Sequence, residues 1–135
     1  AVSYVLENKT TKDVTAYFSL ANDRVSVTDF ESNSAFNRFR RKRFVHEKRL
    51  RTYPAVKICR LAVAQSMRGK TIGSFLLDFI KSYFLVDNKT GCRFVTVDAY
   101  LDAVPFYERN DFSLLKSKDE DLVTRLLFFD LASIK

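Results

Sequence analysis

The stretch from Lys57 to Phe84, KICRLAVAQSMRGKTIGSFLLDFIKSYF, predicts the central part of the fold of this 135-residue chain. Its first part, Ile58 to Ala64, is apolar apart from Cys59 and Arg60, and a short apolar run of this kind is typical of a buried strand. A compact loop, Gln65 to Gly73, follows this strand and holds two of the three glycines of the chain. We therefore expect a compact loop at the end of a buried strand.

An amphipathic helix is predicted to follow the loop. Its apolar residues recur at the spacing of one helix face. They are Ile72, Phe75, Leu76, Phe79, Ile80, Tyr83 and Phe84. The first turn of a helix has N–H groups without backbone partners and carries the positive end of the helix dipole, and glycine lets a bulky anion approach. With Arg68 and Lys70 beside it, this loop favours a phosphate-bearing ligand.

The spacing of the glycines narrows the choice of ligand. Neither the P-loop pattern nor the G-x-G-x-x-G dinucleotide pattern is present. The loop instead resembles the coenzyme A loop of the GNAT N-acetyltransferases, where a strand precedes [RQ]-x-x-G-x-[GA], often RGKGIG, and then a helix. This chain reads Arg68-Gly69-Lys70-Thr71-Ile72-Gly73 at that point, and Thr71 replaces a residue that is usually glycine in the family.

A second GNAT hallmark follows in the right order. The segment from Ala103 to Phe112 resembles A-x-x-F-Y-x-x-x-G-F, with Asn110-Asp111 in place of the usual x-Gly. Asn and Asp tolerate the left-handed backbone conformation that glycine adopts easily, so we expect such a turn here. Two motifs in order are more specific than either alone.

The resemblance implies an acetyl-CoA-dependent N-acetyltransferase in which Tyr107 is the general acid. An unperturbed tyrosine has a pKa of about 10, so it can donate a proton to the leaving thiolate at neutral pH. The backbone of the strand end is expected to pair with the pantetheine arm, and the N–H of Ala62 or Val63 to polarise the thioester carbonyl. The predicted cofactor-binding residues are Leu61, Ala62, Val63, Arg68, Gly69, Lys70, Thr71, Ile72, Gly73 and Ser74.

The predicted fold is an α/β GNAT fold, with a mostly antiparallel central sheet, a βαβ acetyl-CoA-binding core and one domain over residues 1–135. Strands are expected at 2–6, 14–20, 55–64, 93–99, 112–115 and 122–134, and helices at 72–84 and 102–110. A further helix, capped near Ser32 to Ser34, is expected to hold Phe36 and Phe39 and to end before Tyr53-Pro54. The family has one strand and one or two helices before this point, so we expect a missing N-terminal segment.

The positive charge is concentrated in one window. Residues 37–51 hold eight Lys/Arg and a single acid, which accounts for the whole net charge of +7. The basic residues are Arg38, Arg40, Arg41, Lys42, Arg43, Lys48, Arg49 and Arg51. This patch is either a solvated face, a surface for an acidic protein, or a nucleic-acid site in which Phe36, Phe39, Phe44 and His46 stack on bases.

Three shorter matches resemble the GNAT toxins of bacterial toxin–antitoxin pairs. They are Arg51-Thr52-Tyr53-Pro54, Arg60-Leu61-Ala62-Val63 and Phe106-Tyr107-Glu108-Arg109. This resemblance implies acetylation of the α-amino group of aminoacyl-tRNA, a small ribbon-helix-helix antitoxin as partner and a cytoplasmic location. An α-amino group with a pKa of about 8 needs little help to lose its proton, which suits a chain without an obvious catalytic Glu or His.

Alternatives remain at this stage. The acceptor is otherwise a small amine or a protein N-terminus, or the chain is a GNAT-shaped binding module without catalysis; a homodimer is also left open. No apolar run reaches the roughly 18 residues of a membrane span. Cys59 and Cys92 lack the spacing of a metal site and are expected to be buried, reduced thiols.

Overall fold

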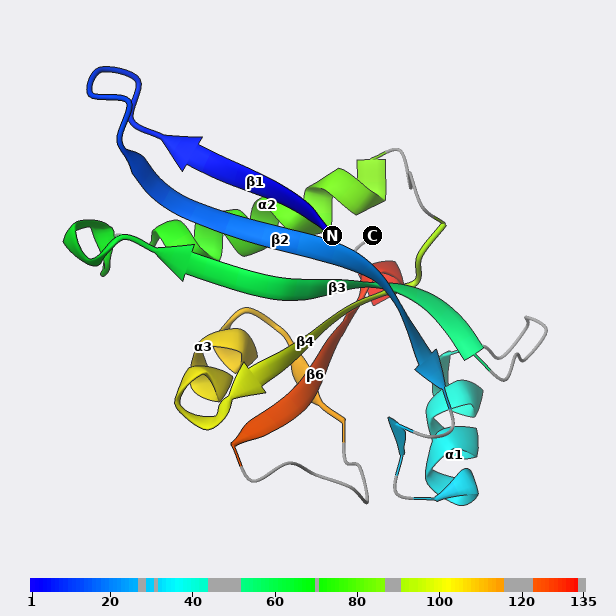
Figure 1. The fold of residues 1–135 in the computed structure, drawn as a ribbon. Helices are drawn as coiled ribbons and strands as arrows, with labels where there is room; N and C mark the ends of the chain where they lie inside the picture. The colour runs from blue at the N-terminus through cyan, green and yellow to red at the C-terminus, as the bar shows by residue number, and fades with distance from the viewer. Residues whose placement is uncertain are drawn as a thin grey trace.

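The protein is a mixed sheet with helices on both faces (Figure 1). The structure is a computed structural model. It describes residues 1–26, 29–30, 32–43, 52–69, 71–86, 91–115 and 123–133, apart from the side chain of Lys42. The elements, including three 3₁₀ turns, follow in the order β1 (Val2–Glu7), β2 (Val14–Ser26), α1 (Asn33–Arg43), β3 (Thr52–Val63), η2 (Gln65–Met67), α2 (Ile72–Val86), β4 (Phe94–Tyr100), η3 (Leu101–Ala103), α3 (Val104–Arg109), β5 (Ser113–Leu114), β6 (Thr124–Asp130) and η4 (Leu131–Ser133).

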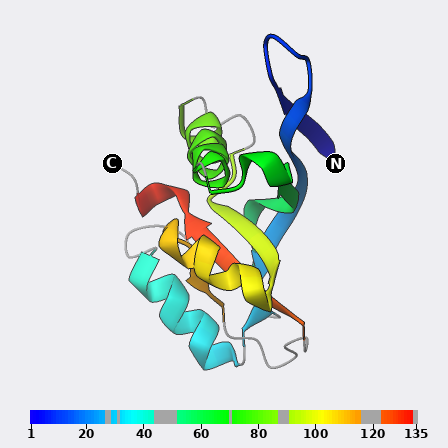
Figure 2. The same ribbon diagram turned by 90° about the vertical axis from the view of Figure 1, so that its left-hand side faces the viewer.

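The strands lie in the order β1-β2-β3-β4-β6-β5. Only β3 and β4 run parallel, and α2 connects them, while the other neighbours are antiparallel. This is the mostly antiparallel sheet with a βαβ core that the sequence predicts. The β1–β2 hairpin extends beyond the rest of the sheet at one end (Figures 1 and 2).

The boundaries of three strands differ from the predicted ones. β2 continues six residues past the predicted end to Ser26, and β3 begins at Thr52, because these two segments pair with each other over their full length. The sequence predicts that Tyr53-Pro54 ends the preceding helix. In the structure, Pro54 lies within β3, and its carbonyl accepts a hydrogen bond from the Arg93 N–H at 2.8 Å. β6 ends at Asp130, before a single 3₁₀ turn.

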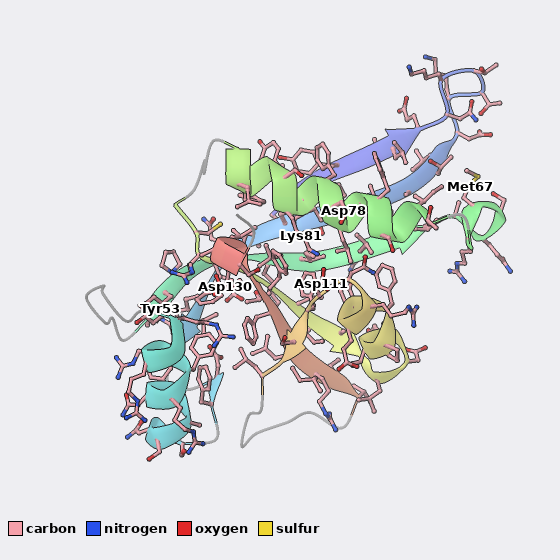
Figure 3. All side chains as sticks on the ribbon, turned by 180° about the vertical axis from the view of Figure 1, so that it is seen from behind. Tyr53, Met67, Asp78, Lys81, Asp111 and Asp130 are labelled. Atoms are coloured by element: carbon pink, nitrogen blue, oxygen red, sulfur yellow. The ribbon has the colours of Figure 1, made fainter. Side chains whose placement is uncertain are left out.

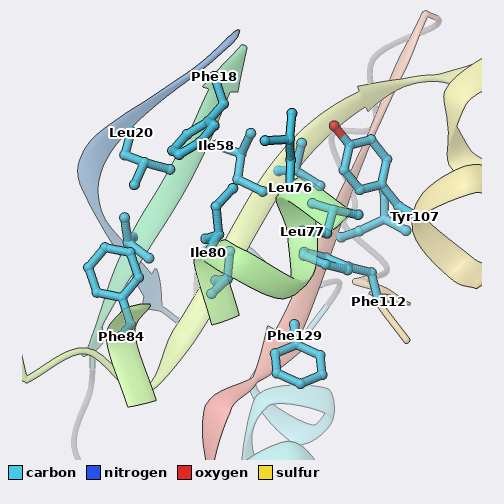
Figure 4. Packing of buried hydrophobic residues seen from close by; sticks show 14 of the residues in the cluster. Phe18, Leu20, Ile58, Leu76, Leu77, Ile80, Phe84, Tyr107, Phe112 and Phe129 are labelled. Atoms are coloured by element: carbon cyan, nitrogen blue, oxygen red, sulfur yellow. The ribbon is translucent and has the colours of Figure 1, made fainter. Parts of the chain in front are cut away.

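The main core lies between one face of the sheet and the helices α2 and α3. Strand alternation places Phe18, Ile58 and Val97 on this face, where they belong to the same buried cluster as Leu77 and Tyr107. Figure 4 shows Tyr107 beside Leu76 and Leu77 of α2, with Phe112 below it. The site described below is therefore built beside the larger of the two buried clusters.

A second core lies on the opposite face of the sheet, under α1. Phe36 and Phe39 of α1 are 3% and 8% exposed and pack against Tyr53, Phe94 and Phe128. The expectation that these two aromatic rings stack on bases is therefore wrong, because the sheet face buries them. Phe44 and His46 lie outside the described residues.

The start and the end of α1 are each fixed by a polar contact. The Ser32 hydroxyl accepts a hydrogen bond from the Ala35 N–H at 3.1 Å, as expected of a helix cap. At the other end Asp130 binds both Arg93 (2.7 Å) and Arg43 (3.4 Å). These contacts attach α1 firmly to the last long strand.

The two cysteines differ in burial. Cys92 is 5% exposed, as expected, and lies just before β4. Cys59 is exposed, which contradicts the prediction, because it lies at a register irregularity between β2 and β3. A bulged residue leaves the regular alternation of a strand, so its burial does not follow from the apolar pattern around it.

Candidate active site

β3 and β4 separate at the centre of the sheet. They pair only over Ala55–Ile58 with Phe94–Val97, although β3 continues to Val63 and β4 to Tyr100. On its other edge β3 remains paired with β2 up to Val63. In the described strands, the edge of β3 from Leu61 to Val63 that faces β4 therefore has no strand partner, and its backbone groups are open to a ligand.

A groove of about 760 Å³ lies beside this open edge. It contains every predicted cofactor-binding residue except Lys70, which lies outside the described residues. The lining residues are Leu61, Ala62, Val63, Met67, Arg68, Gly69, Thr71, Ile72, Gly73, Ser74, Asp102, Phe106 and Arg109. Four lining residues were not predicted from the sequence: Met67, Asp102, Phe106 and Arg109. Phe106 and Arg109 belong to the second motif.

The loop before α2 is held in an unusual backbone conformation. Gly69 and Thr71 have φ angles of +80° and +61°. The Thr71 carbonyl accepts a hydrogen bond from the Phe75 N–H at 3.0 Å, so this residue is the N-cap of α2. The Arg68 side chain turns back and donates to the Val63 carbonyl at 3.4 Å, which ties the loop to the end of β3.

Replacing Thr71 by Gly is expected to stabilise the protein. The left-handed conformation costs a residue with a Cβ roughly 1 kcal/mol relative to glycine, whereas exchanging Thr for Gly at a helix start costs only a few tenths. We expect an increase of about 0.5–1 kcal/mol in the free energy of unfolding, measured by urea denaturation. Unchanged or lower stability would mean that the Thr71 side chain contributes more to this loop than its strain costs.

The first turn of α2 lies against α3. A Cβ at Gly73 would come within 2.9 Å of the Phe106 ring. The glycine is therefore needed here for close packing and not for an unusual φ angle. Because Phe106 also lines the groove, this contact connects helix packing with the shape of the ligand site.

Gly73→Ala is expected to weaken acetyl-CoA binding about tenfold, because the added methyl group pushes the Phe106 ring toward the groove. Isothermal titration calorimetry of both proteins would measure the change. Ser82→Ala, at an exposed position of α2 that does not line the groove, is the control. Equal affinities of Gly73→Ala and the parent protein would show that the ring moves elsewhere.

Tyr107 lies on α3 at the junction between the core and the split strands. It is 7% exposed and packs against Phe106 and Phe112, with ring centroids 5.1 and 5.5 Å away. Burial raises the pKa of Tyr107 to about 12, so the hydroxyl stays protonated at physiological pH. Tyr107 lines a second cavity of about 360 Å³, and Leu61 lies on the wall of both this cavity and the groove.

The end of α3 is fixed by a lysine of α2. Asp111 has a φ of +71°, which confirms the left-handed turn expected where the family has glycine. Lys81 is 5% exposed, donates from Nζ to the Asn110 carbonyl at 2.6 Å and lies 4.2 Å from the centroid of the Phe129 ring (Figure 3). Burial lowers the pKa of Lys81. Lys81 was not predicted as part of the site. The sequence feature that points to it is a lysine close to the apolar face of the predicted helix.

The basic residues of α1 divide into two groups. Arg38 and Arg41 are exposed and line a surface hollow with Ser34 and Asn37. Arg40 and Arg43 are half-buried and cover the rings of Phe36 and Phe39 at 4.5 and 4.2 Å. Of the other predicted nucleic-acid residues, Lys48, Arg49, Arg51 and the side chain of Lys42 lie outside the described structure.

The described ranges contain neither a cluster of metal-ligating side chains nor a membrane-spanning helix. No group of three or more His, Cys, Asp or Glu side chains there could hold a metal ion. No helix among these residues is both long and apolar enough to cross a membrane.

Comparison with protein-family models identifies the family. Residues 28–127 match the model of the acetyltransferase (GNAT) domain. The chain belongs to the GNAT acetyltransferase family. The match includes the coenzyme A loop and the segment around Tyr107, so the family resemblance read from the two sequence motifs is confirmed. A search of curated proteins found no match.

Solved structures of GNAT toxins share the fold of this family member. AtaT in complex with acetyl-methionyl-tRNAfMet is 23% identical, with a TM-score of 0.71 over 98% of this chain and 72% of that one. A mutant of KacT is 21% identical, with a TM-score of 0.75 over 98% and 72%. A mutant of AtaT bound to acetyl-CoA and the C-terminus of the antitoxin AtaR is 21% identical, with a TM-score of 0.69 over 98% and 69%.

Proposed function

We propose that this GNAT protein transfers the acetyl group of acetyl-CoA to the α-amino group of an aminoacyl-tRNA by direct attack in a ternary complex. The proposal rests on the open edge of β3. This edge lies beside the start of α2, and its residue Leu61 also lines the cavity that contains Tyr107. It offers backbone groups for an extended ligand, N–H groups for phosphates and a proton donor in one continuous site.

Each part of the groove suits one part of acetyl-CoA. The edge of β3 at Leu61 to Val63, which lacks a strand partner on this side, suits the amide groups of the pantetheine arm, as an added strand would. The first turn of α2, with Arg68 beside it, suits the pyrophosphate. An N–H of Ala62 or Val63 would polarise the thioester carbonyl, and the Tyr107 hydroxyl would donate its proton to the departing sulfur.

The basic helix favours a large anionic acceptor over a small amine. The exposed Arg38 and Arg41 belong to α1, which lies against the start of β3 through the contact of Phe36 with Tyr53 (Figure 1). A small amine offers these guanidinium groups no anionic partner, whereas the phosphates of a tRNA do. AtaT bound to an acetylated aminoacyl-tRNA has the same fold and supports this choice of acceptor.

The remaining assignments follow from this proposal. Because charged tRNA is cytoplasmic, we place the protein there, as a single acetyltransferase domain over residues 1–135. AtaT binds the C-terminus of its antitoxin, so we propose a small ribbon-helix-helix antitoxin as the protein partner. A small amine or a protein N-terminus is the second candidate acceptor, since the split between β3 and β4 alone can receive either.

The experiment measures acetylation of total tRNA charged with a mixture of amino acids, using radiolabelled acetyl-CoA at 50 and 300 mM salt. We expect acetylation whose KM for tRNA rises at least tenfold at the higher salt, because phosphate contacts release counterions. Arg38→Ala with Arg41→Ala should raise KM at low salt. Lys9→Ala with Lys12→Ala, which removes two exposed charges from the turn between β1 and β2, should not raise KM for tRNA. Binding of acetyl-CoA without acetylation of any charged tRNA would contradict the proposed acceptor.

A further inference from the structure

The cavity lined by Tyr107 has walls from both faces of the sheet, since Val97 and Asp98 point to opposite faces of β4. Alternation along β4 places Phe94, Thr96 and Asp98 on one face, and Phe94 packs against Phe39 of α1 with ring centroids 5.4 Å apart. Asp98 lines the cavity at the point where β3 and β4 have separated. An acceptor held by α1 would therefore meet Asp98 as it enters the cavity.

Asp98 is the carboxylate placed to serve this cavity. The lining residues are Tyr17, Ile58, Cys59, Arg60, Leu61, Val97, Asp98, Ala99, Tyr100, Ala103 and Tyr107. Two acids near it, Asp23 and Asp29, do not line the cavity. Asp23 accepts a hydrogen bond from the Thr96 hydroxyl at 2.6 Å, and Asp29 accepts one from the Ser26 N–H at 2.8 Å.

Asp98 forms an ion pair with a lysine of β3. Lys57 Nζ lies 2.5 Å from Asp98 Oδ2, and the hydrogen bond with Asp98 raises the pKa of Lys57. The Asp98 side chain still has 45% of its surface exposed, so a second donor can approach it. An accessible carboxylate can accept a hydrogen bond and then a proton.

We propose that Asp98 receives the acceptor amine and is the general base of the reaction, a role that rests on the function proposed above. The neutral amine donates a hydrogen bond to Asp98 and attacks the thioester carbon, forming the C–N bond. Its nitrogen becomes strongly acidic and gives one proton to Asp98. The C–S bond then breaks, Tyr107 donates its proton to sulfur, and the products are the amide and the free thiol. Asp98 passes its proton to water, Tyr107 regains its proton from solvent, and one proton is released overall when the amine enters as ammonium.

The test compares three variants on charged tRNA at saturating acetyl-CoA. Asp98→Asn keeps the shape of the side chain but removes the base, and is expected to lower kcat about 100-fold. Asp98→Glu, which retains a carboxylate, should recover part of this loss. Lys57→Gln breaks the same ion pair and leaves the carboxylate in place, so its kcat should stay within about threefold of the parent value.

Binding of acetyl-CoA to every variant is measured alongside and should change less than twofold, which shows that the groove is intact. Activity of Asp98→Asn within threefold of the parent would overturn the role of Asp98 while leaving the proposed function in place. An equal loss of kcat in Lys57→Gln would also overturn the role of Asp98 as general base, because the Lys57–Asp98 ion pair would then act only by holding the structure together. A parent protein that binds acetyl-CoA but acetylates no charged tRNA would overturn the acceptor class and this inference together.

Discussion

Tyr107→Phe is expected to lower kcat by about 100- to 1,000-fold and to leave the Kd for acetyl-CoA within twofold of the parent value. The substitution removes only the hydroxyl group that we propose as proton donor. The phenylalanine ring can keep the packing against Phe106 and Phe112. Steady-state rates of acetyl transfer and calorimetric titration with acetyl-CoA measure the two quantities separately.

The raised pKa of Tyr107 adds a pH dependence to this prediction. Because burial raises the pKa to about 12, the proton donor is present throughout the physiological range and is lost only near that pH. The same shift stabilises the folded protein fully below the unfolded pKa of about 10, and this contribution disappears as the pH rises from about 10 to about 12. An alkaline loss of activity well below pH 10 would therefore have another cause.

Tyr100→Phe provides the control for Tyr107→Phe. Tyr100 lines the same cavity but is 67% exposed and lies at the end of β4. Its variant should keep kcat within about threefold of the parent. If Tyr107→Phe has no larger effect than Tyr100→Phe, Tyr107 is a packing residue and the proton reaches sulfur by another route.

Asp130→Ala is expected to lower the free energy of unfolding by about 2–3 kcal/mol. The Asp130 side chain is 14% exposed and binds two arginines, Arg43 from α1 and Arg93 before β4, whose side chains are 23% and 20% exposed. Removing one partner of a largely buried ion pair leaves the remaining charge without compensation, although partial exposure reduces the cost. Urea denaturation monitored by circular dichroism measures the change.

The same substitution should weaken tRNA binding, because the contact attaches the basic helix to the sheet. We expect KM for charged tRNA to rise about tenfold while the Kd for acetyl-CoA, whose groove lies on other elements, stays unchanged. Asp78→Ala on the surface of α2 is the control and should alter stability by less than about 0.5 kcal/mol. A loss of stability without any change in KM would separate the anchoring of α1 from acceptor binding.

Much of the site could be predicted from local sequence. A strand, a glycine-containing loop and a helix with one apolar face are defined by neighbouring residues, so the order Ile58 to Phe84 predicts both the groove and the start of α2. The left-handed turn at Asp111 also follows locally, since only a few residue types tolerate that conformation. These features depend on backbone geometry that the adjacent residues determine themselves.

Other features depend on residues far apart in the chain. Asp98 shares a cavity with Tyr17 and Tyr107 only because β3 and β4 separate, and no local pattern specifies where parallel strands separate. Phe36 and Phe39 look suited to base stacking in sequence, yet the sheet face that covers them is formed by Tyr53, Phe94 and Phe128.

By itself, the sequence determined the family, the coenzyme A loop and the residue proposed as proton donor, because short motifs encode them. Only the tertiary structure decided which basic residues reach solvent, that Cys59 is exposed, and which carboxylate lines the same cavity as the proposed proton donor. Burial and ion pairing depend on which strands lie side by side, and that arrangement results from packing the whole sheet between α1 on one face and α2 with α3 on the other.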